Sequence, residues 1–318
     1  MKLSAIDVSH GTTHDGPGMR TTVFVKGCSL HCLWCQNPES ISKRNEPWWD
    51  KTHCIGCASC KDACKNGALS MDGDGVHIDR KKCLACLKCT EACPSEALTP
   101  EAQSYDLESL LRELLKDEHF YKENSGGVTF SGGEPLLQYE FIVEVFKSLQ
   151  SRGITTALDT CGAAPQRNLE AILPYTDYVL YDMKIFDSEQ HLHYTGLPNE
   201  PILSNLLYVA QYIRTSSRTV RLWIRTPLIP DATATEDNIR KIGTFLSSHL
   251  SDVVERWELC AFNGICQTKY ERLGLQWHYA HQSPMSAQQV NGLLAAAYSV
   301  FPKEKIMASG MIKTDSAK

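Results

Sequence analysis

The sequence predicts an α/β protein with a parallel sheet, into which a small cysteine-rich module is inserted. Two observations lead to this fold class. After residue 100, apolar segments of strand length alternate with amphipathic segments of helix length, which is the pattern of βαβ units in an open or barrel-like sheet. Between residues 48 and 99 this periodicity is lost and a cysteine-containing unit occurs twice. We therefore expect residues 1–47 and 100–318 to form the main domain and residues 48–99 to form the insert.

The expected elements follow one another along the chain. Residues 3–27 contain two apolar strands around a polar turn at residues 14–18. Asp106 can cap a helix that begins at Leu107, and Gly153 can end a later one. Polar residues follow several later strands, where parallel sheets commonly place their active sites. The later strands are expected at 128–130, 155–159, 178–184, 219–226 and 257–262, and the later helices at 139–152, 169–173, 203–213, 238–250 and 286–300.

The composition is that of an ordinary globular protein. Of the 318 residues 42% are apolar and 22% are charged, and no apolar run approaches the length of a membrane span. The N-terminal residues lack the apolar stretch of an export signal, so we expect a cytoplasmic protein. The net charge of −5 offers no attraction to nucleic acid or to an anionic membrane. We expect neither as a partner, and we expect a monomer.

Cysteine is the outlier of the composition, because eleven of the fourteen cysteines lie between Cys28 and Cys93. Disulfides are disfavoured, since they need an oxidising compartment and nothing here directs export. Within the insert, a run of four cysteines with gaps of two, two and three residues recurs 29 residues later. The first run is Cys54, Cys57, Cys60 and Cys64, and the second is Cys83, Cys86, Cys89 and Cys93.

This doubled run has the spacing of bacterial ferredoxins, which hold two [4Fe–4S] clusters. In that arrangement the fourth cysteine of each run serves the other cluster. We therefore assign one cluster to the first three cysteines of the first run with Cys93, and the other to the first three of the second run with Cys64. Zinc is the alternative, but a structural zinc site takes four ligands, usually from two well-separated pairs.

Three further cysteines, Cys28, Cys32 and Cys35, form a loop of a different kind. No fourth cysteine lies near them in the sequence. A four-iron cluster held by three thiolates has one iron without a protein ligand, where a substrate can bind. Three buried structural thiols are the alternative interpretation.

Several strands end in residues suited to bind a small polar ligand. Gly132 and Gly133 allow close approach of a backbone to a ligand, and the carboxylate of Glu134 can pair with an ammonium group. Asp182 and Lys184 share one face of a strand, so they can pair with each other or flank one ligand. The other candidates at strand ends are Asp159, Thr160, Met183 and Arg225, whereas Arg221 can be merely solvated.

The three-cysteine loop after the first strands resembles that of the radical SAM superfamily. The resemblance implies that the open iron binds S-adenosylmethionine and that an electron from the cluster cleaves it to methionine and a 5′-deoxyadenosyl radical. It places Trp34 beside the adenine, and Gly132, Gly133 and Glu134 at the methionine amino group.

Nearly the whole chain is similar to glycyl radical enzyme activating enzymes, in the long form with a two-cluster insert. The resemblance covers Asp15 to Arg20, Gly27, Asn37 to Glu39, and the motifs that end the later strands. It implies a partial (β/α)6 barrel with a ferredoxin-like insert. It also implies abstraction of a Cα hydrogen from a glycine of a partner glycyl radical enzyme, with flavodoxin or ferredoxin as the reductant.

The same resemblance suggests roles for individual residues. Asp159, Thr160, Asp182, Met183 and Lys184 would contact the ribose or a monovalent cation beside the cosubstrate carboxylate. Arg225 would reach that carboxylate, and the turn of Asp15, Gly16, Pro17 and Gly18 would receive the glycine loop of the partner. Asn263 stands where many relatives have a histidine, so it can form a hydrogen bond with the ribose but cannot titrate.

Two other functions are compatible with parts of the pattern. One is a radical SAM enzyme that acts on a small molecule or makes another protein modification. The other is an electron carrier, in which a ferredoxin module is fused to an inert barrel; the three-cysteine loop and Gly132 to Glu134 disfavour it. Cys161, Cys260 and Cys266 match no cluster pattern, and we interpret them as ordinary buried or loop thiols.

Overall fold

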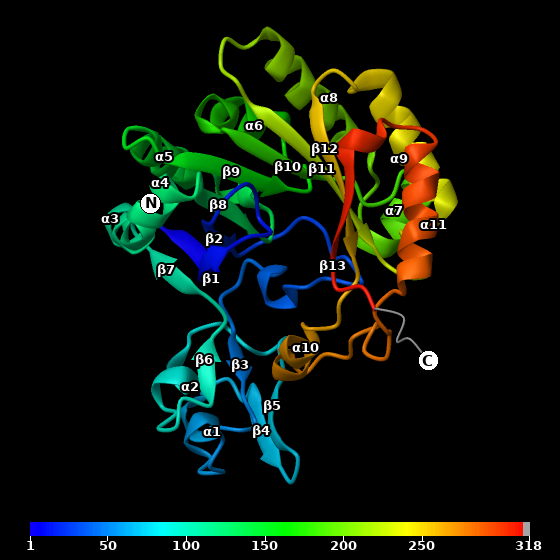
Figure 1. The fold of residues 1–318 in the computed structure, drawn as a ribbon. Coiled ribbons are helices and arrows are strands. Elements are labelled where there is room, and N and C mark those ends of the chain that lie inside the picture. The colour runs from blue at the N-terminus through cyan, green and yellow to red at the C-terminus, as the bar shows by residue number, and fades with distance from the viewer. Residues whose placement is uncertain (314–318) are drawn as a thin grey trace.

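The computed structural model describes residues 1–313 and is built around one nine-stranded sheet (Figure 1). The strand order is β13-β12-β11-β10-β9-β8-β2-β1-β7. The N-terminal strands β1 and β2 form the expected antiparallel pair, and β7 pairs antiparallel with β1 at the edge. The strands are β1 (Leu3–Thr12), β2 (Arg20–Val25), β7 (Gln103–Tyr105), β8 (Gly127–Gly132), β9 (Thr155–Thr160), β10 (Tyr178–Asp182), β11 (Arg221–Leu228), β12 (Val254–Ala261) and β13 (Ile306–Gly310).

From β2 to β13 every neighbouring pair in this sheet is parallel, and the spatial order follows the order in the chain. Because parallel crossovers are right-handed and the order never reverses, the connecting helices are expected on one face of the sheet. Figure 1 shows most of them on the outer side of the strands, whereas α10 lies beside the cysteine-rich unit. The helices are α3 (Leu107–Leu114), α4 (Glu118–Glu123), α5 (Tyr139–Gln150), α6 (Gln166–Ile172), α7 (Ser188–Thr195), α8 (Glu200–Thr215), α9 (Glu236–His249), α10 (Gln267–Leu273) and α11 (Ala287–Tyr298).

Local chemistry explains where these helices begin and which side they bury. The carboxylate of Asp106 accepts a hydrogen bond of 2.8 Å from the Ser109 amide at the start of α3, as expected, and Leu110 and Leu114 of α3 are buried. The main apolar core lies between the helices and the sheet. Short 3-10 helices extend or connect the elements: η1 (Pro38–Ser40), η2 (Leu115–Asp117), η3 (Pro135–Gln138), η4 (Leu173–Tyr175) and η5 (Lys303–Lys305).

All strands and helices expected after residue 100 are present, with ends shifted by a few residues. The sequence analysis missed β7, β13, α4, α7 and α10. These elements are short or carry little periodicity, as in α10 (QTKYERL), and contacts with the rest of the fold stabilise them. Within residues 1–313 there is no helix with the length and apolarity that a bilayer crossing requires.

The cysteine-rich segment forms a separate small unit below the sheet (Figure 1). Its base is an antiparallel pair of β3 (Pro47–Trp49) and β6 (Leu98–Pro100), where the chain enters and leaves. Between them lie α1 (Ser59–Ala63), the hairpin of β4 (Leu69–Asp72) and β5 (Gly75–Ile78), and α2 (Lys88–Glu91).

The repeat of this unit extends to its backbone geometry. Left-handed residues occur in three pairs, each 29 positions apart: Gly56 with Ala85 (φ 71° and 54°), Ala58 with Leu87 (62° and 59°), and Gly67 with Glu96 (60° and 54°). Non-glycine residues avoid this conformation unless their surroundings impose it, and such strain concentrates at functional sites. Both copies therefore fold their cysteine loops in the same constrained way.

Candidate active site

A cavity of about 370 Å³ opens at the carboxyl ends of the parallel strands. The cysteine loop after β2 forms one part of its wall, and residues at the ends of β8 to β11 form another. Its lining residues are Asp15, Phe24, Cys28, Leu30, Cys32, Trp34, Cys35, Gln36, Asn37, Ser131, Gly132, Gly133, Asp159, Thr160, Cys161, Asp182, Lys184, Arg225, Pro227 and Cys260. The fold therefore brings the first three cysteines and most of the strand-end candidates to one place.

The three-cysteine loop is held by hydrogen bonds from its backbone to other parts of the chain. The Cys28 amide donates to the Ile41 carbonyl at 3.1 Å, the His31 amide to the Thr195 carbonyl at 2.7 Å, and the Tyr270 hydroxyl to the Cys35 carbonyl at 2.9 Å. Burial raises the pKa of the Cys32 thiol to about 12. Metal ligation requires the thiolate, so binding of iron at this loop would release protons.

Packing alone requires glycine at positions 132 and 133, whether or not a ligand binds there. A Cβ atom on Gly133 would lie 2.3 Å from the Gly27 carbonyl oxygen, and one on Gly132, where φ is +102°, would lie 2.5 Å from the Val25 nitrogen. The Gly133 amide donates to the Val25 carbonyl at 2.8 Å, and the Glu134 amide to the Gly27 carbonyl at 2.8 Å. This segment is therefore fastened to the strand that leads into the cysteine loop.

The Glu134 carboxylate, expected at the methionine amino group, points away from the cavity in this structure. Its side chain is fully buried and does not line the cavity. It accepts hydrogen bonds from the Thr160 hydroxyl (2.6 Å) and from the amides of Cys161 (2.9 Å) and Leu136 (3.0 Å), and the Cys161 sulfur lies 2.9 Å from it. Burial raises the pKa of Glu134. The carboxylate is therefore occupied in joining the ends of β8 and β9, and is not free to pair with a ligand ammonium group.

Asp159 and Arg225 form an ion pair in the wall of the cavity. Their closest atoms, Asp159 Oδ2 and Arg225 Nη1, are 3.2 Å apart, and the Ser131 hydroxyl donates to the same carboxylate oxygen at 2.7 Å. The other oxygen, Oδ1, is buried and has no hydrogen-bond partner among the described residues. Burial raises the pKa of Asp159 to about 6, although Arg225 opposes the shift. The Oδ1 atom of Asp159 thus remains available as a hydrogen-bond acceptor beside the guanidinium of Arg225.

Asp182 and Lys184 pair with each other, which was one of the two expected arrangements, and both line the cavity. Burial lowers the pKa of Lys184, but the nearby Asp182 outweighs that effect and the pKa is raised overall. Lys184 therefore stays charged at neutral pH. Arg221, by contrast, is exposed and lies 3.6 Å from Glu255, as expected for a solvated residue.

Comparison with known proteins identifies the family. The model of the Radical SAM superfamily matches residues 22–239. The (2S)-3-sulfopropanediol dehydratase activating enzyme of Klebsiella oxytoca is 37% identical over 85% of this chain and 85% of its own. The indoleacetate decarboxylase activating enzyme of Tractidigestivibacter scatoligenes is 36% identical over 92% and 93%, and the isethionate sulfite-lyase activating enzyme of Desulfovibrio desulfuricans 38% over 83% and 84%. The chain belongs to the radical SAM superfamily, among the glycyl radical enzyme activating enzymes.

Membership in this superfamily implies S-adenosylmethionine and a [4Fe–4S] cluster. The donor set fits both groups. Cys28, Cys32 and Cys35 are three thiols on one wall of a single cavity, while opposite charges from Asp159, Asp182, Lys184 and Arg225 lie within the same space. A zwitterionic amino acid moiety needs donors and acceptors of both signs, and this radical SAM enzyme presents both.

Some expected site residues of this radical SAM enzyme lie outside the cavity. Met183 is buried behind it and donates its amide to the Arg225 carbonyl at 2.8 Å. The Asn263 carbonyl accepts a hydrogen bond from the Gln36 side chain at 3.1 Å, and its own side chain accepts from the Ile265 amide at 3.2 Å. Neither side chain lines the cavity, and the contact of Asn263 with a ribose stays a prediction.

The turn at residues 15–18 reaches the cavity only through Asp15. The Thr22 hydroxyl donates to its carboxylate at 2.8 Å, and the Thr129 hydroxyl to its carbonyl at 2.6 Å. Gly18 instead packs on residues 124–126, where a Cβ atom would lie 2.3 Å from the Asn124 carbonyl oxygen. The turn thus contributes one acidic residue to the wall of the cavity.

Sequence reasoning missed several lining residues of the cavity. Cys161 and Cys260 were interpreted as ordinary thiols; Cys161 is indeed buried and Cys260 half-buried, but both line the cavity. Each follows or ends a strand of the parallel sheet, and that position was the available signal. The remaining missed residues are Phe24, Leu30, Gln36, Asn37, Ser131 and Pro227.

The insert of this enzyme contains two smaller cavities, each lined by four thiols. One, the outer site, includes Cys54, Cys57, Cys60 and Cys93; the other, the inner site, includes Cys64, Cys83, Cys86 and Cys89. These are the same two groups that the doubled spacing predicts. Within residues 1–313, no three His, Cys, Asp or Glu side chains are arranged to hold a single metal ion.

Proposed function

We propose that this protein activates a partner glycyl radical enzyme, by radical cleavage of S-adenosylmethionine and abstraction of a Cα hydrogen from a glycine of the partner. The observation that carries the proposal is the shared cavity. Three thiols without a fourth in their motif face the same 370 Å³ space as the glycine turn and four charged strand-end residues. Relatives at 36–38% identity are named as activating enzymes.

Cys28, Cys32 and Cys35 would hold the catalytic cluster, which supplies the electron that cleaves the sulfonium bond when the cosubstrate is bound. Backbone groups of Gly132 and Gly133 would meet the methionine amino group, because both positions lack a side chain and line the cavity. Trp34, which also lines the cavity, would contact the adenine.

The charged residues would orient the other end of the cosubstrate. Arg225 and Lys184 would attract its carboxylate, and Asp182 and Thr160 would contact the ribose or a monovalent cation. The unpartnered Oδ1 of Asp159 supports a cation site, because a buried carboxylate oxygen gains a partner when a cation binds beside it.

The glycine loop of the partner would enter past Asp15, the one residue of the turn that lines the cavity. We further propose that the open sheet is the partial (β/α)6 barrel of the family. The unreversed order of its parallel strands supports this, since it places the helices on one face and leaves the other to enclose a site. A small apolar cluster of Ala157, Leu180 and Trp223 is separate from the main core, as an inner barrel face would be.

Residues 48–99 would form a ferredoxin-like insert with one [4Fe–4S] cluster in the outer site and one in the inner site. Together with the catalytic cluster this gives three. A one-electron donor such as flavodoxin or ferredoxin would supply the reducing equivalents. Since relatives are named for dehydratases, decarboxylases and a sulfite-lyase, the partner would belong to that broad group of glycyl radical enzymes.

Anaerobic reconstitution tests the proposal. With dithionite and S-adenosylmethionine, the protein should form 5′-deoxyadenosine, and with its partner it should generate a glycyl radical doublet in electron paramagnetic resonance. An electron carrier would form no 5′-deoxyadenosine. An enzyme for small molecules or other modifications would form it without a glycyl radical on any partner encoded nearby, and either result would refute the activase function.

A further inference from the structure

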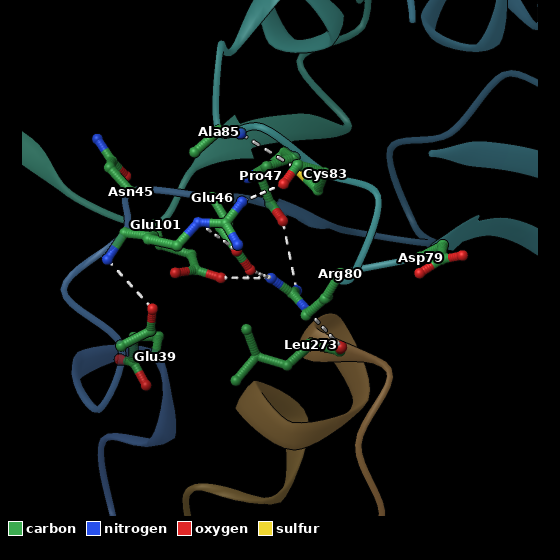
Figure 2. Close-up of polar contacts among 12 residues, drawn as sticks. Glu39, Asn45, Glu46, Pro47, Asp79, Arg80, Cys83, Ala85, Glu101 and Leu273 are labelled. Carbon is green, nitrogen blue, oxygen red and sulfur yellow. Dashed lines mark hydrogen bonds and ion pairs between the residues drawn. The ribbon is translucent and has the colours of Figure 1, made fainter. Parts of the chain in front are cut away.

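A chain of charged side chains joins the main domain to the insert (Figure 2). Lys26, at the end of β2, is 2.6 Å from Glu101, which follows β6. Arg80, from the insert, is 2.8 Å from Glu101 and 2.7 Å from Glu46, and it also donates to the carbonyls of Pro47 and Leu273 at 3.3 Å. Figure 2 shows the guanidinium of Arg80 next to both carboxylates, which accept hydrogen bonds from the same nitrogen, Nη1.

Arg44 ends this chain at a cysteine of the inner site. Its Nε is 3.2 Å from Glu46, and its Nη2 donates to the carbonyl of Cys83. The carbonyl of Ile41, three residues earlier, accepts the amide hydrogen of Cys28. The segment around Ile41 and Arg44 therefore contacts both sites. Its backbone binds the three-cysteine loop of Cys28, Cys32 and Cys35, called the catalytic loop below, and its Arg44 side chain binds the backbone of Cys83 at the inner site.

Burial keeps Lys26, Glu46 and Glu101 in place, whereas Arg44 is half-exposed and is positioned by Glu46, and the junction as a whole has a net sign. The Lys26 side chain is inaccessible to solvent, and Glu46 and Glu101 are no more than 5% exposed. Breaking one partner of a buried pair leaves an uncompensated charge, so such a network holds one geometry. Three cations, Lys26, Arg44 and Arg80, face two carboxylates, which leaves one surplus positive charge beside the inner site.

The two sites of the insert are therefore electrostatically unequal despite their equal spacing. None of the described residues that line the outer site is charged. Lys88 lines the inner site, and the residue 29 positions earlier, beside the outer site, is Ser59. The inner site thus has Lys88 and Arg44, and the outer site has neither.

We infer that Arg44, assisted by Lys88, raises the reduction potential of the inner cluster above that of the outer cluster, so that electrons collect beside the catalytic loop. A cluster gains one negative charge on reduction, and a nearby cation stabilises that reduced form. The inference rests on the proposed function. One electron from a low-potential donor protein passes from the outer to the inner site and on to the catalytic cluster, where cleavage of one S-adenosylmethionine consumes it; no proton is transferred.

Redox titration of the anaerobically reconstituted full chain, followed by electron paramagnetic resonance, tests the inference. Cys86→Ser and Cys57→Ser identify the signals of the inner and outer clusters. In wild type the inner midpoint should be higher. Arg44→Gln should make the midpoint potential of the inner cluster more negative and leave the potentials of the outer and catalytic clusters unchanged. Arg44→Lys, which keeps the positive charge, should keep the inner potential close to that of the wild type. Lys82→Gln is the matched control, because Lys82 adjoins Cys83 but is 64% exposed and paired with Asp79.

If the Arg44→Gln protein does not bind its iron, exchanging the residues at the equivalent positions 88 and 59 still tests the inference. Lys88→Ser should lower the inner midpoint, and Ser59→Lys should raise the outer one. Equal shifts in Arg44→Gln and Lys82→Gln, no shift in the exchange variants, or an outer midpoint at or above the inner one would overturn the inference. Formation of 5′-deoxyadenosine with dithionite is measured in parallel, so failure of the proposed function is recognised independently of the midpoints.

Discussion

The catalytic loop and the insert both present cysteines from short loops, but their surroundings differ in kind. The three thiols of the loop face a cavity of about 370 Å³ with charged walls, whereas each group of four thiols in the insert borders only about 20 Å³ of mainly apolar space. A site with a complete set of thiols needs no room for another ligand. A loop that supplies only three thiols needs room and charge beside it for the molecule that completes the set.

Removing one thiol of the catalytic loop is expected to have the largest effect on activity. Cys32→Ala should abolish formation of 5′-deoxyadenosine, because two thiols cannot hold the cluster at the cavity. Iron content should fall from about twelve to about eight per chain. Cys266→Ala is the control, since Cys266 is buried but lines none of the three thiol cavities. A Cys32→Ala protein that keeps its activity would remove the basis of the proposed function.

Loss of thiols from the insert should reduce turnover less, and the size of the reduction should depend on the reductant. The double variant Cys57→Ala and Cys86→Ala removes one exposed thiol from each insert site. We expect slower turnover with flavodoxin or ferredoxin, because the relay is interrupted, and substantial activity with dithionite, which can reduce the catalytic cluster directly. Rates with both reductants are compared in the same preparation. Full activity with the protein reductant would contradict a relay.

The glycine turn offers a test of stability that is specific to the main domain. Gly133→Ala places a Cβ atom 2.3 Å from the carbonyl oxygen of Gly27, which belongs to the backbone and cannot rotate away. We expect a loss of roughly 3 kcal/mol in the free energy of unfolding. Gly73→Ala in the β4–β5 turn of the insert meets no atom within 4 Å and should be nearly neutral. Denaturant unfolding of both variants measures the difference, and equal stabilities would contradict the close packing.

The smallest expected effect is a change in pH dependence caused by Asp159. Its pKa of about 6 in the folded protein is above the ordinary value of about 3.9. The folded state thus binds this proton more tightly than the unfolded state, so the associated stability is present below about pH 4 and is lost as the pH rises through about 6. In apoprotein without sodium or potassium, Asp159→Asn should remove this pH-dependent contribution to the free energy of unfolding, on the order of 3 kcal/mol. An unchanged slope of thermal stability between pH 4 and 7 would contradict the shift.

Much of the fold and part of the site could be predicted from the sequence. The helix capped by Asp106, the strand–turn–strand start and the alternation after residue 100 depend on contacts within a few residues, and all were confirmed. The missed α10 and β13 are short elements whose stability depends on packing against distant segments. The thiol groupings were predictable because ligand spacing within one loop is a local property.

The sequence by itself determined the family chemistry: three cysteines in one loop, a doubled four-cysteine run, and polar residues at the ends of parallel strands. Only the tertiary structure decided which of those residues meet. It turned the Glu134 carboxylate away from the cavity, brought Cys161 and Cys260 into it, and joined Arg44 to the backbone of Cys83. The physical reason is that residue type and spacing set what a side chain can do, whereas its burial and its partners, which here lie 26 to 235 positions away in the chain, set what it does in this fold.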